Sequence, residues 1–150
     1  MTKKTVEVLC ADDDADDRFM IAEAWKESLI VNKIQFVEDG EDLMDYLLNQ
    51  GKYTDQETYS MPGLILLDLN MPRKSGREAL AEIKANPKLK KIPIVVLTTS
   101  KTESDVLSTY ELGVSSFITK PITLDGLVNV MKSLSKYWFE IVELPVGSRQ

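Results

Sequence analysis

The chain of 150 residues contains no histidine and only one cysteine. Without histidine, nucleophile pairs of the Ser-His and Cys-His types are excluded, and so are zinc sites built on imidazole. Cys10 has no partner for an internal disulfide. Because it lies in an apolar run, we expect a buried small hydrophobe rather than a reactive thiol. Any chemistry must therefore come from carboxylates, hydroxyls, lysine or a bound metal.

Long apolar runs and an excess of basic residues are lacking as well. No apolar run approaches the length that spans a membrane, and the polar start of the chain has no signal-peptide character, so we expect a cytoplasmic protein. The formal net charge of -6 argues against nucleic acid as a direct partner. Hydrophobic residues make up 43% of the chain, which is enough for the core of one packed domain.

Short apolar runs typical of strands alternate along the chain with stretches of helical periodicity. The predicted strands are Val6–Ala11, Ile34–Val37, Leu64–Leu69, Ile92–Leu97 and Ser116–Thr119. The residues predicted to face inward from the helices include Ile21, Ala24, Trp25 and Leu29, then Leu43, Met44, Leu47 and Leu48, then Ala79, Leu80 and Ile83, then Val106, Leu107 and Tyr110, and finally Leu124, Leu127, Val128, Met131 and Trp138. The polar segment Gln50–Pro62 is expected to be a long surface loop. This alternation predicts an α/β fold, with a parallel sheet covered by helices on both faces.

The stretch Leu64–Leu69 is the centre of this pattern, because an ionisable residue, Asp68, stands at the end of an otherwise apolar strand. A continuous apolar run of this length is typical of a strand that is buried on both faces. The carboxyl ends of such strands are where open α/β sheets form their ligand sites. Since a buried unpaired charge is costly, Asp68 is expected to have a cationic partner or a metal.

Polar side chains also end three other predicted strands. They are Asp12 and Asp13, Thr98, and Lys120. In a parallel sheet these ends lie along one edge, so the aspartates would be close together. At about 4 Å and an effective dielectric constant near 20, two carboxylates repel by on the order of 4 kcal/mol. A cation offsets this repulsion, and a set of oxygen ligands suits Mg²⁺. With a lysine and a hydroxyl added, the edge would hold the groups that phosphoryl transfer onto an aspartate requires.

Each of these features has a simpler explanation when it is taken alone. An aspartate pair after a strand is often a helix-capping cluster, and Asp14, Asp16 and Asp17 suit the N-cap and the positive end of the next helix. A single aspartate at a strand end is often a turn residue, and Thr-Thr-Ser is often a polar loop. Their occurrence together at the ends of successive strands favours a functional site.

From about Val6 to Tyr137 the sequence resembles the receiver domains of response regulators in two-component signalling. The residues that carry this resemblance are Asp12 and Asp13, Asp68 followed by Met71-Pro72 and Gly76, Thr98, and Lys120-Pro121. The resemblance implies a flavodoxin-like (βα)5 fold, whose five-stranded parallel sheet has the order 2-1-3-4-5. It also implies that residues 1–136 form the receiver domain.

The resemblance further implies a role for each site residue. Asp68 would be the phosphoacceptor, and Thr98 and Lys120 would bind phosphoryl oxygens. The Mg²⁺ ligands would be Asp12, Asp13, Asp68 and the backbone carbonyl of Asn70. Thr98 and Phe117 would form the switch, since Phe117 matches the aromatic residue that turns inward on activation in this family. The peptide between Lys120 and Pro121 would be cis.

Within the family, the chain resembles the small regulators that partner phytochrome histidine kinases. The matching features are Ala15–Arg18, the loop Gln50–Pro62, Thr98–Ser100 and the tail from Tyr137 to Pro145. Too few residues follow the last predicted helix for a DNA-binding domain, so we expect output through contacts with a downstream protein. Tails of this kind contribute to homodimers in the subgroup, and we expect residues 137–150 to form a dimer contact. Packing of this tail on its own domain is the alternative.

We therefore expect a stand-alone response regulator rather than an ordinary enzyme. A sensor histidine kinase would phosphorylate Asp68 with Mg²⁺, and the receiver would assist its own phosphorylation and dephosphorylation. Two other functions stay open. A small aspartate-nucleophile phosphatase would fit the Asp-x-Asp pattern of Asp12–Asp14, but Asp16 stands where such enzymes have threonine or valine. A degenerate receiver would serve as an unphosphorylated docking module.

Overall fold

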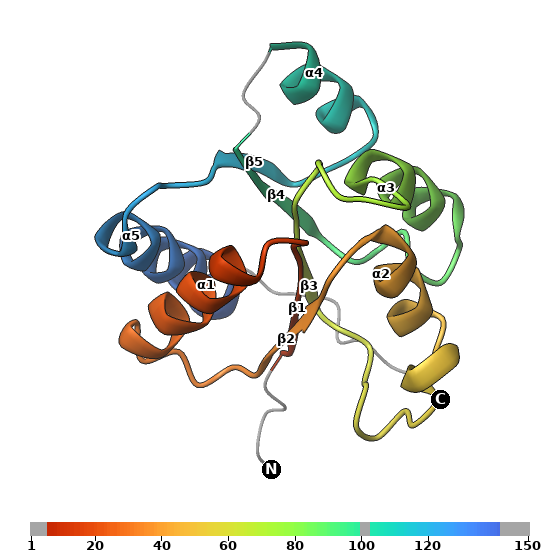
Figure 1. The fold of residues 1–150 in the computed structure, drawn as a ribbon, viewed down its shortest axis with the longest axis horizontal. Helices are drawn as coiled ribbons and strands as arrows, with labels where there is room; N and C mark the ends of the chain where they lie inside the picture. The colour runs from red at the N-terminus through yellow and green to blue at the C-terminus, as the bar shows by residue number, and fades with distance from the viewer. Residues whose placement is uncertain (1–5, 100–102, 142–150) are drawn as a thin grey trace.

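The computed structural model describes residues 6–99 and 103–141. Within them, the strands form one parallel sheet in the order β2-β1-β3-β4-β5 (Figure 1), which confirms the order that the resemblance implies. The strands are β1 (Val8–Ala11), β2 (Ile34–Val37), β3 (Leu64–Leu67), β4 (Ile94–Thr98) and β5 (Ser116–Thr119). The helices are α1 (Ala15–Glu27), α2 (Gly40–Leu47), α3 (Gly76–Ala85), α4 (Glu103–Glu111) and α5 (Leu124–Ser135). None of the helices in these ranges has the length and apolar character needed to cross a membrane.

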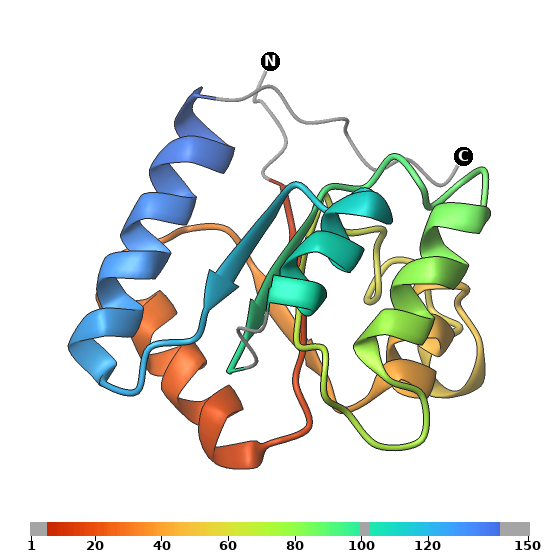
Figure 2. The ribbon, with the colours of Figure 1, turned by 90° about the horizontal axis from the view of Figure 1, so that it is seen from above.

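Helices cover both faces of the sheet, with α1 and α5 on one face and α2 and α3 on the other (Figure 1, Figure 2). Alternate side chains of β3 enter the two cores. Leu64 and Leu66 pack with α1 and α5, whereas Ile65 and Leu67 pack with α2 and α3. Cys10 is buried in the α1–α5 core, as expected, and burial raises the pKa of its thiol. Complete burial of β1, β3 and β4 is what a central strand covered on both faces requires.

The first turn of α1 is fixed by the residues that the sequence assigns to it. The Asp14 side chain accepts hydrogen bonds from the backbone N–H groups of Asp16 and Asp17, so Asp14 is the N-cap. The two residues that donate to this cap, Asp16 and Asp17, also place acidic side chains at the positive end of the helix. The start of α1 is therefore held at the carboxyl edge of the sheet, directly after Asp12 and Asp13.

Four apolar residues that were predicted to face inward are exposed instead, and each has a local reason. They are Leu29, Leu48, Leu107 and Tyr110, with exposed fractions of 86%, 42%, 61% and 46%. Leu29 lies beyond the end of α1 with φ of 56°, and Leu48 is the C-cap of α2. The other two lie on α4, which stands beside the edge strand β5 (Figure 1), at the margin of the sheet.

The segment Gln50–Pro62, predicted to be a polar surface loop, contributes aromatic side chains to the core. Gly51–Tyr53 forms a short 3-10 helix, and the Tyr53 side chain is 6% exposed. Its ring centroid lies 5.2 Å from that of Tyr46 and 4.9 Å from that of Tyr59. The polar composition of the segment hides this cluster, because exposed residues stand on both sides of Tyr53 and separate it from Tyr59.

The predicted tail begins as a continuation of α5. Residues Lys136–Ile141 form a π-helical turn that extends the helix. Trp138 is 8% exposed and belongs to the α1–α5 core, and Phe139 meets the ring of Trp25 edge-on at 6.1 Å. The first residues of the tail thus pack on their own domain, while residues 142–150 lie outside the described part of the chain.

Candidate functional site

The carboxyl edge of the sheet brings together the polar residues that end its strands. Asp12 follows β1, Asp68 follows β3 and Thr98 ends β4, while Lys120 follows β5. Gly76, the first residue of α3, lies against this edge, because a Cβ atom there would stand 2.2 Å from the Asp68 carbonyl oxygen. Glycine therefore allows the start of α3 to approach the strand end that carries Asp68.

Three carboxylates form a cluster with the chemistry of a divalent metal site. Asp12, Asp13 and Asp68 each offer an oxygen atom, and these atoms lie within 4.8 Å of one another. Asp12 and Asp68 are 1% and 7% exposed, whereas Asp13 is exposed to solvent. A set of oxygen donors that is open on one side suits Mg²⁺, which keeps several of its water ligands. The predicted metal ligands that carry carboxylates therefore do come together.

Asn70 lies close to this cluster through its backbone. Its N–H donates a hydrogen bond to Asp68 Oδ1 at 3.3 Å. The segment after β3 thus folds back over the Asp68 carboxylate. The predicted use of the Asn70 carbonyl as a metal ligand remains a prediction.

Lys120 reaches into the acidic cluster with almost no exposure. Its side chain is 4% exposed, and Nζ lies 2.6 Å from Asp12 Oδ2 and 3.4 Å from Asp68 Oδ2. Burial alone would lower the pKa of Lys120, but its hydrogen bonds to Asp12 and Asp17 outweigh burial and raise it. For the carboxyl of Asp12 the effect of burial has the opposite sign: burial raises its pKa, although the hydrogen bond with Lys120 acts to lower it. Lys120 is therefore a fixed cation within reach of the Asp68 carboxylate.

The hydroxyl of Thr98 is the other group that touches Asp68. Thr98 is fully buried, and its Oγ1 donates to Asp68 Oδ1 at 2.7 Å. Phe117 lies on the neighbouring strand β5, where it pairs in register with Val96 of β4. Its side chain is partly buried against the α2–α3 core, and its backbone N–H donates to the Tyr110 hydroxyl at 3.2 Å. The two predicted switch residues thus lie on adjacent strands.

One residue of the site was predicted for a different role. Asp17 was assigned only to the positive end of α1, yet its Oδ2 lies 2.8 Å from Lys120 Nζ. The sequence does carry a signal for this position. Asp17 is four residues before Ile21 and eight before Trp25, so it belongs to the buried face of α1.

The predicted cis peptide before Pro121 is wrong. Among the described residues no peptide bond is cis. The expectation came from the resemblance alone, and for a bond that precedes proline the trans form is favoured by about 0.5–1 kcal/mol.

Comparison with known proteins decides the family. Residues 8–132 match the sequence model of the family described as response regulator receiver domain. The chain belongs to this family. The protein is therefore a receiver-domain signalling protein.

Individual relatives of this receiver are similar over nearly their whole length. The response regulator Rcp1 of Synechocystis sp. is 44% identical over 140 residues, which cover 93% of each chain. The crystal structure of the Mn²⁺-bound form of Rcp1 has 43% identity and a TM-score of 0.84, covering 94% of this chain and 99% of that one. The phosphorylated cyanobacterial phytochrome response regulator RcpA has 40% identity and a TM-score of 0.86, covering 95% and 99%.

Proposed function

We propose that the protein is a stand-alone response regulator whose Asp68 accepts a phosphoryl group from a partner histidine kinase. The observation that carries the proposal is the environment of the Asp68 carboxylate. Oδ1 accepts the Thr98 hydroxyl at 2.7 Å, and Oδ2 lies 3.4 Å from Lys120 Nζ. The same carboxylate belongs to the acidic cluster with Asp12 and Asp13. Asp68 thus has a hydroxyl donor, a nearby cation and two further carboxylates that could bind a metal together with it.

In the transfer step, an Asp68 carboxylate oxygen forms a bond to phosphorus while the bond from phosphorus to the histidine nitrogen of the kinase breaks. The electron pair of that bond returns to the imidazole nitrogen. Lys120 stabilises negative charge on the phosphoryl oxygens, and Thr98 donates a hydrogen bond to one of them. By the same contacts the receiver assists its own phosphorylation and dephosphorylation.

Mg²⁺ is the metal we propose for the cluster, held by Asp12, Asp13, Asp68 and the Asn70 carbonyl. Bound there, it would neutralise charge on the carboxylates and on the phosphoryl oxygens. The Mn²⁺-bound form of Rcp1, at 43% identity, supports a divalent ion for this chain. The exposure of Asp13 supports it as well, because a hydrated ion needs an open side.

The output is proposed to pass through Thr98 and Phe117. When Thr98 moves to a phosphoryl oxygen, β4 carries the change to the neighbouring β5, on which Phe117 lies. The edge formed by α4, β5 and α5 would then present a different surface to a downstream protein. The exposed Leu107 and Tyr110 of α4 support an interaction surface there.

A phytochrome histidine kinase is the partner we propose. Support comes from RcpA, a phytochrome response regulator, and from Rcp1 at 44% identity. Two exposed apolar side chains at the carboxyl edge suit the docking of a kinase. Phe19 and Ile122 are 66% and 91% exposed. Phe19 comes two residues after Asp17 and Ile122 comes two residues after Lys120, and Asp17 and Lys120 form an ion pair. A cytoplasmic location stays a prediction.

A homodimer is the assembly we propose, with residues 137–150 contributing to the contact. An apolar hollow of about 380 Å³ lies between β5 and α5, lined by Ile118, Val130, Leu134, Tyr137 and Trp138 among others. Sedimentation of the full chain beside a chain that ends at Ile141 tests this proposal. Truncation after Ser135 is unsuitable, because it removes Trp138 from the core. Monomers of both chains at the same concentration would contradict the dimer.

The test of phosphorylation is intact-mass measurement after incubation with acetyl phosphate, with and without Mg²⁺. We expect one phosphoryl adduct that requires Mg²⁺, is released by hydroxylamine and is absent in Asp68→Asn. Asp125→Asn, on the exposed side of α5, is the matched control and should be labelled like the wild type. An adduct that persists in Asp68→Asn would assign a different acceptor, and the absence of any adduct would favour the docking module.

A further inference from the structure

The ammonium group of Lys120 is surrounded by more carboxylate acceptors than a role toward Asp68 alone requires. An ammonium group has three N–H donors. Nζ of Lys120 has three carboxylate neighbours, Asp12 at 2.6 Å, Asp17 at 2.8 Å and Asp68 at 3.4 Å. Each donor thus has an acceptor, and the contact with Asp68 is the longest of the three. The donor that faces Asp68 can pass to a phosphoryl oxygen on that residue, but Lys120 can offer a second donor to the phosphoryl group only if Asp12 or Asp17 gives one up.

Asp17 is the acceptor that is least tied to the rest of the site. Its side chain is 32% exposed, against 2% for Asp12 and 9% for Asp68. It comes from α1 and lies outside the cluster of three carboxylates suited to a metal. Water can therefore replace Lys120 at Asp17, whereas the buried carboxylate of Asp12 has less access to water.

We propose that Asp17 is a positioning residue that holds Lys120 toward α1 in the unphosphorylated protein and so opposes the phosphorylated state. The proposal rests on the function proposed above, since it needs Lys120 to bind the phosphoryl group on Asp68. In the unphosphorylated protein, Asp17 keeps Lys120 from pairing more closely with Asp68 and leaves that carboxylate available to a metal. In the phosphorylated protein, the contact between Asp17 and Lys120 is given up.

Removing the Asp17 carboxylate therefore changes two affinities in opposite directions. In Asp17→Asn, Lys120 gains a donor for the phosphoryl group, so the affinity for a phosphoryl mimic rises. The same donor can pair with Asp68 before phosphorylation, so the affinity for Mg²⁺ falls. A merely structural role of Asp17 in α1 would lower both affinities together.

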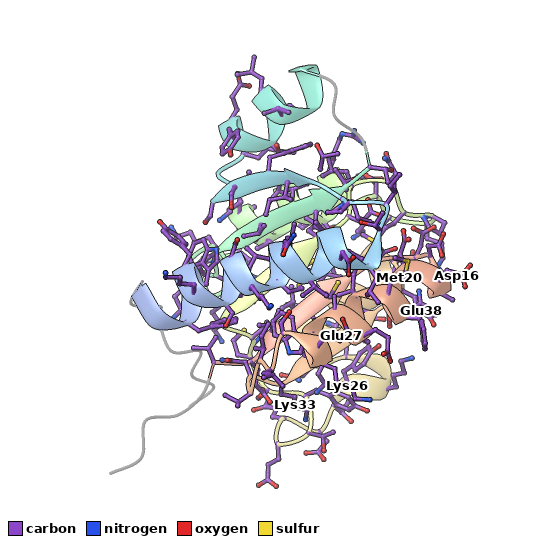
Figure 3. All side chains as sticks on the ribbon, turned by 90° about the vertical axis from the view of Figure 1, so that its left-hand side faces the viewer. Asp16, Met20, Lys26, Glu27, Lys33 and Glu38 are labelled. Atoms are coloured by element: carbon purple, nitrogen blue, oxygen red, sulfur yellow. The ribbon has the colours of Figure 1, made fainter. Side chains whose placement is uncertain are left out.

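Asp16 provides the matched control. It stands in the same first turn of α1, carries the same charge and, like Asp17, gives its backbone N–H to the Asp14 cap. It is exposed, and Figure 3 shows it at the end of α1 that lies near Glu38, away from Lys26 and Lys33. Asp16→Asn thus removes the same charge from the helix terminus and leaves the contact with Lys120 in place.

The experiment measures two dissociation constants for the full chain. One is that of Mg²⁺ alone, by calorimetry. The other is that of beryllofluoride, a phosphoryl mimic, at saturating Mg²⁺, by ¹⁹F NMR. For Asp17→Asn we expect beryllofluoride to bind about tenfold more tightly, as the loss of one charge-assisted competitor predicts. Mg²⁺ should bind more weakly than it does to Asp16→Asn. Asp17→Glu, which restores the carboxylate, should return both constants toward those of the wild type.

The outcomes separate this proposal from the one on which it rests. If the wild type binds beryllofluoride with Mg²⁺ and Asp68→Asn does not, the phosphoacceptor proposal stands. The role of Asp17 is then overturned if Asp17→Asn matches Asp16→Asn, or if both affinities fall together. A wild type that does not bind beryllofluoride would overturn both proposals.

Discussion

Thr98 Oγ1 lies 2.7 Å from Asp68 Oδ1, so the last residue of β4 already touches the carboxylate at the end of β3. Both residues are buried. The hydroxyl can serve the carboxylate in one state and a phosphoryl oxygen in the other. Since β4 pairs with β5 through Thr98 and Thr119, a movement of Thr98 is transmitted directly to the neighbouring strand.

Replacement of Thr98 by valine should separate phosphorylation from its output. Valine has nearly the same shape but no hydroxyl, so Asp68 remains available while the link to β4 is lost. We expect Thr98→Val to bind beryllofluoride with Mg²⁺, yet to show little of the change in the amide signals of β5 that the wild type shows. Two-dimensional NMR measures this, with Phe117 as the reporter. Thr98→Ser keeps the hydroxyl and should behave like the wild type, whereas an unchanged response in Thr98→Val would refute the link.

Charge repulsion in the acidic cluster should appear as a dependence of stability on Mg²⁺. Without metal, the carboxylate of Asp13 repels those of Asp12 and Asp68, all within 4.8 Å. We expect Asp13→Asn to raise the melting temperature by a few degrees in the presence of a chelator. Mg²⁺ should stabilise the wild type and have little effect on this variant, because binding to the native state alone raises stability. Asp16→Asn is the control, and an equal response of both variants to Mg²⁺ would contradict the metal site.

Asp39 should make the stability of the protein depend on pH in the acidic range. The carboxylate is 1% exposed, accepts the N–H of Asp42 at 2.8 Å and pairs with Arg73. Burial alone would raise the pKa of Asp39, but these partners lower it below its usual 3.8. A carboxyl with a lowered folded pKa stabilises the protein above its unfolded pKa, and this contribution is lost as the pH falls through the folded pKa.

Arg73→Met tests this dependence because it removes one of the partners. We expect the variant to be less stable than the wild type near neutral pH, with the difference shrinking as the pH falls below the ordinary carboxyl pKa. Urea unfolding at a series of pH values measures it. Lys33→Met removes an exposed positive charge elsewhere and serves as the control. A difference for Arg73→Met that stays constant down to acidic pH would argue against a role for Asp39.

The tyrosine cluster should contribute to stability although it lies in a polar segment. The Tyr53 hydroxyl donates to Asp42 Oδ1 at 2.7 Å, and the ring is buried against Tyr46 and Tyr59. We expect Tyr53→Phe to lower the free energy of unfolding by about 1 kcal/mol, and Tyr53→Ala to lower it by about 3 kcal/mol or more. Denaturant titration measures both. Tyr137→Phe, at a ring that is 52% exposed, should change little. Equal effects of Tyr53→Phe and Tyr137→Phe would count against the cluster.

The sheet and the main site residues could be predicted because each is encoded locally. The run that ends at Asp68 is apolar at consecutive positions, which is typical of a strand buried on both faces, and parallel strands align their carboxyl ends. Thr98 and Lys120 follow by the same rule. The order of the strands came from the resemblance and not from any single segment.

The features that sequence reasoning missed depend on contacts between distant segments. The spacing of Asp17 from Ile21 and Trp25 indicates the buried face of α1, but it does not identify Lys120, more than a hundred residues later, as the partner of Asp17. The tyrosines of Gln50–Pro62 follow no helical or strand periodicity that would predict their burial. They are wholly or partly buried because they pack against Tyr46, which lies on the preceding helix. The prediction that Leu29 faces inward was wrong, because this residue continues the helical spacing past the point where α1 ends.

Exposed apolar residues near the site should affect transfer from the kinase without affecting the chemistry at Asp68. Phe19 and Ile122 lie at the carboxyl edge, while Val31, which is 88% exposed, lies beyond the opposite end of α1. We expect Phe19→Ala and Ile122→Ala each to slow phosphoryl transfer from the phosphorylated kinase by about tenfold, as the loss of an apolar anchor at an interface predicts. Labelling by acetyl phosphate, which needs no docking, should be unchanged. Val31→Ala is the matched control. Equal slowing by Val31→Ala, or slower labelling by acetyl phosphate, would mean that these side chains act on folding and not on the encounter with the kinase.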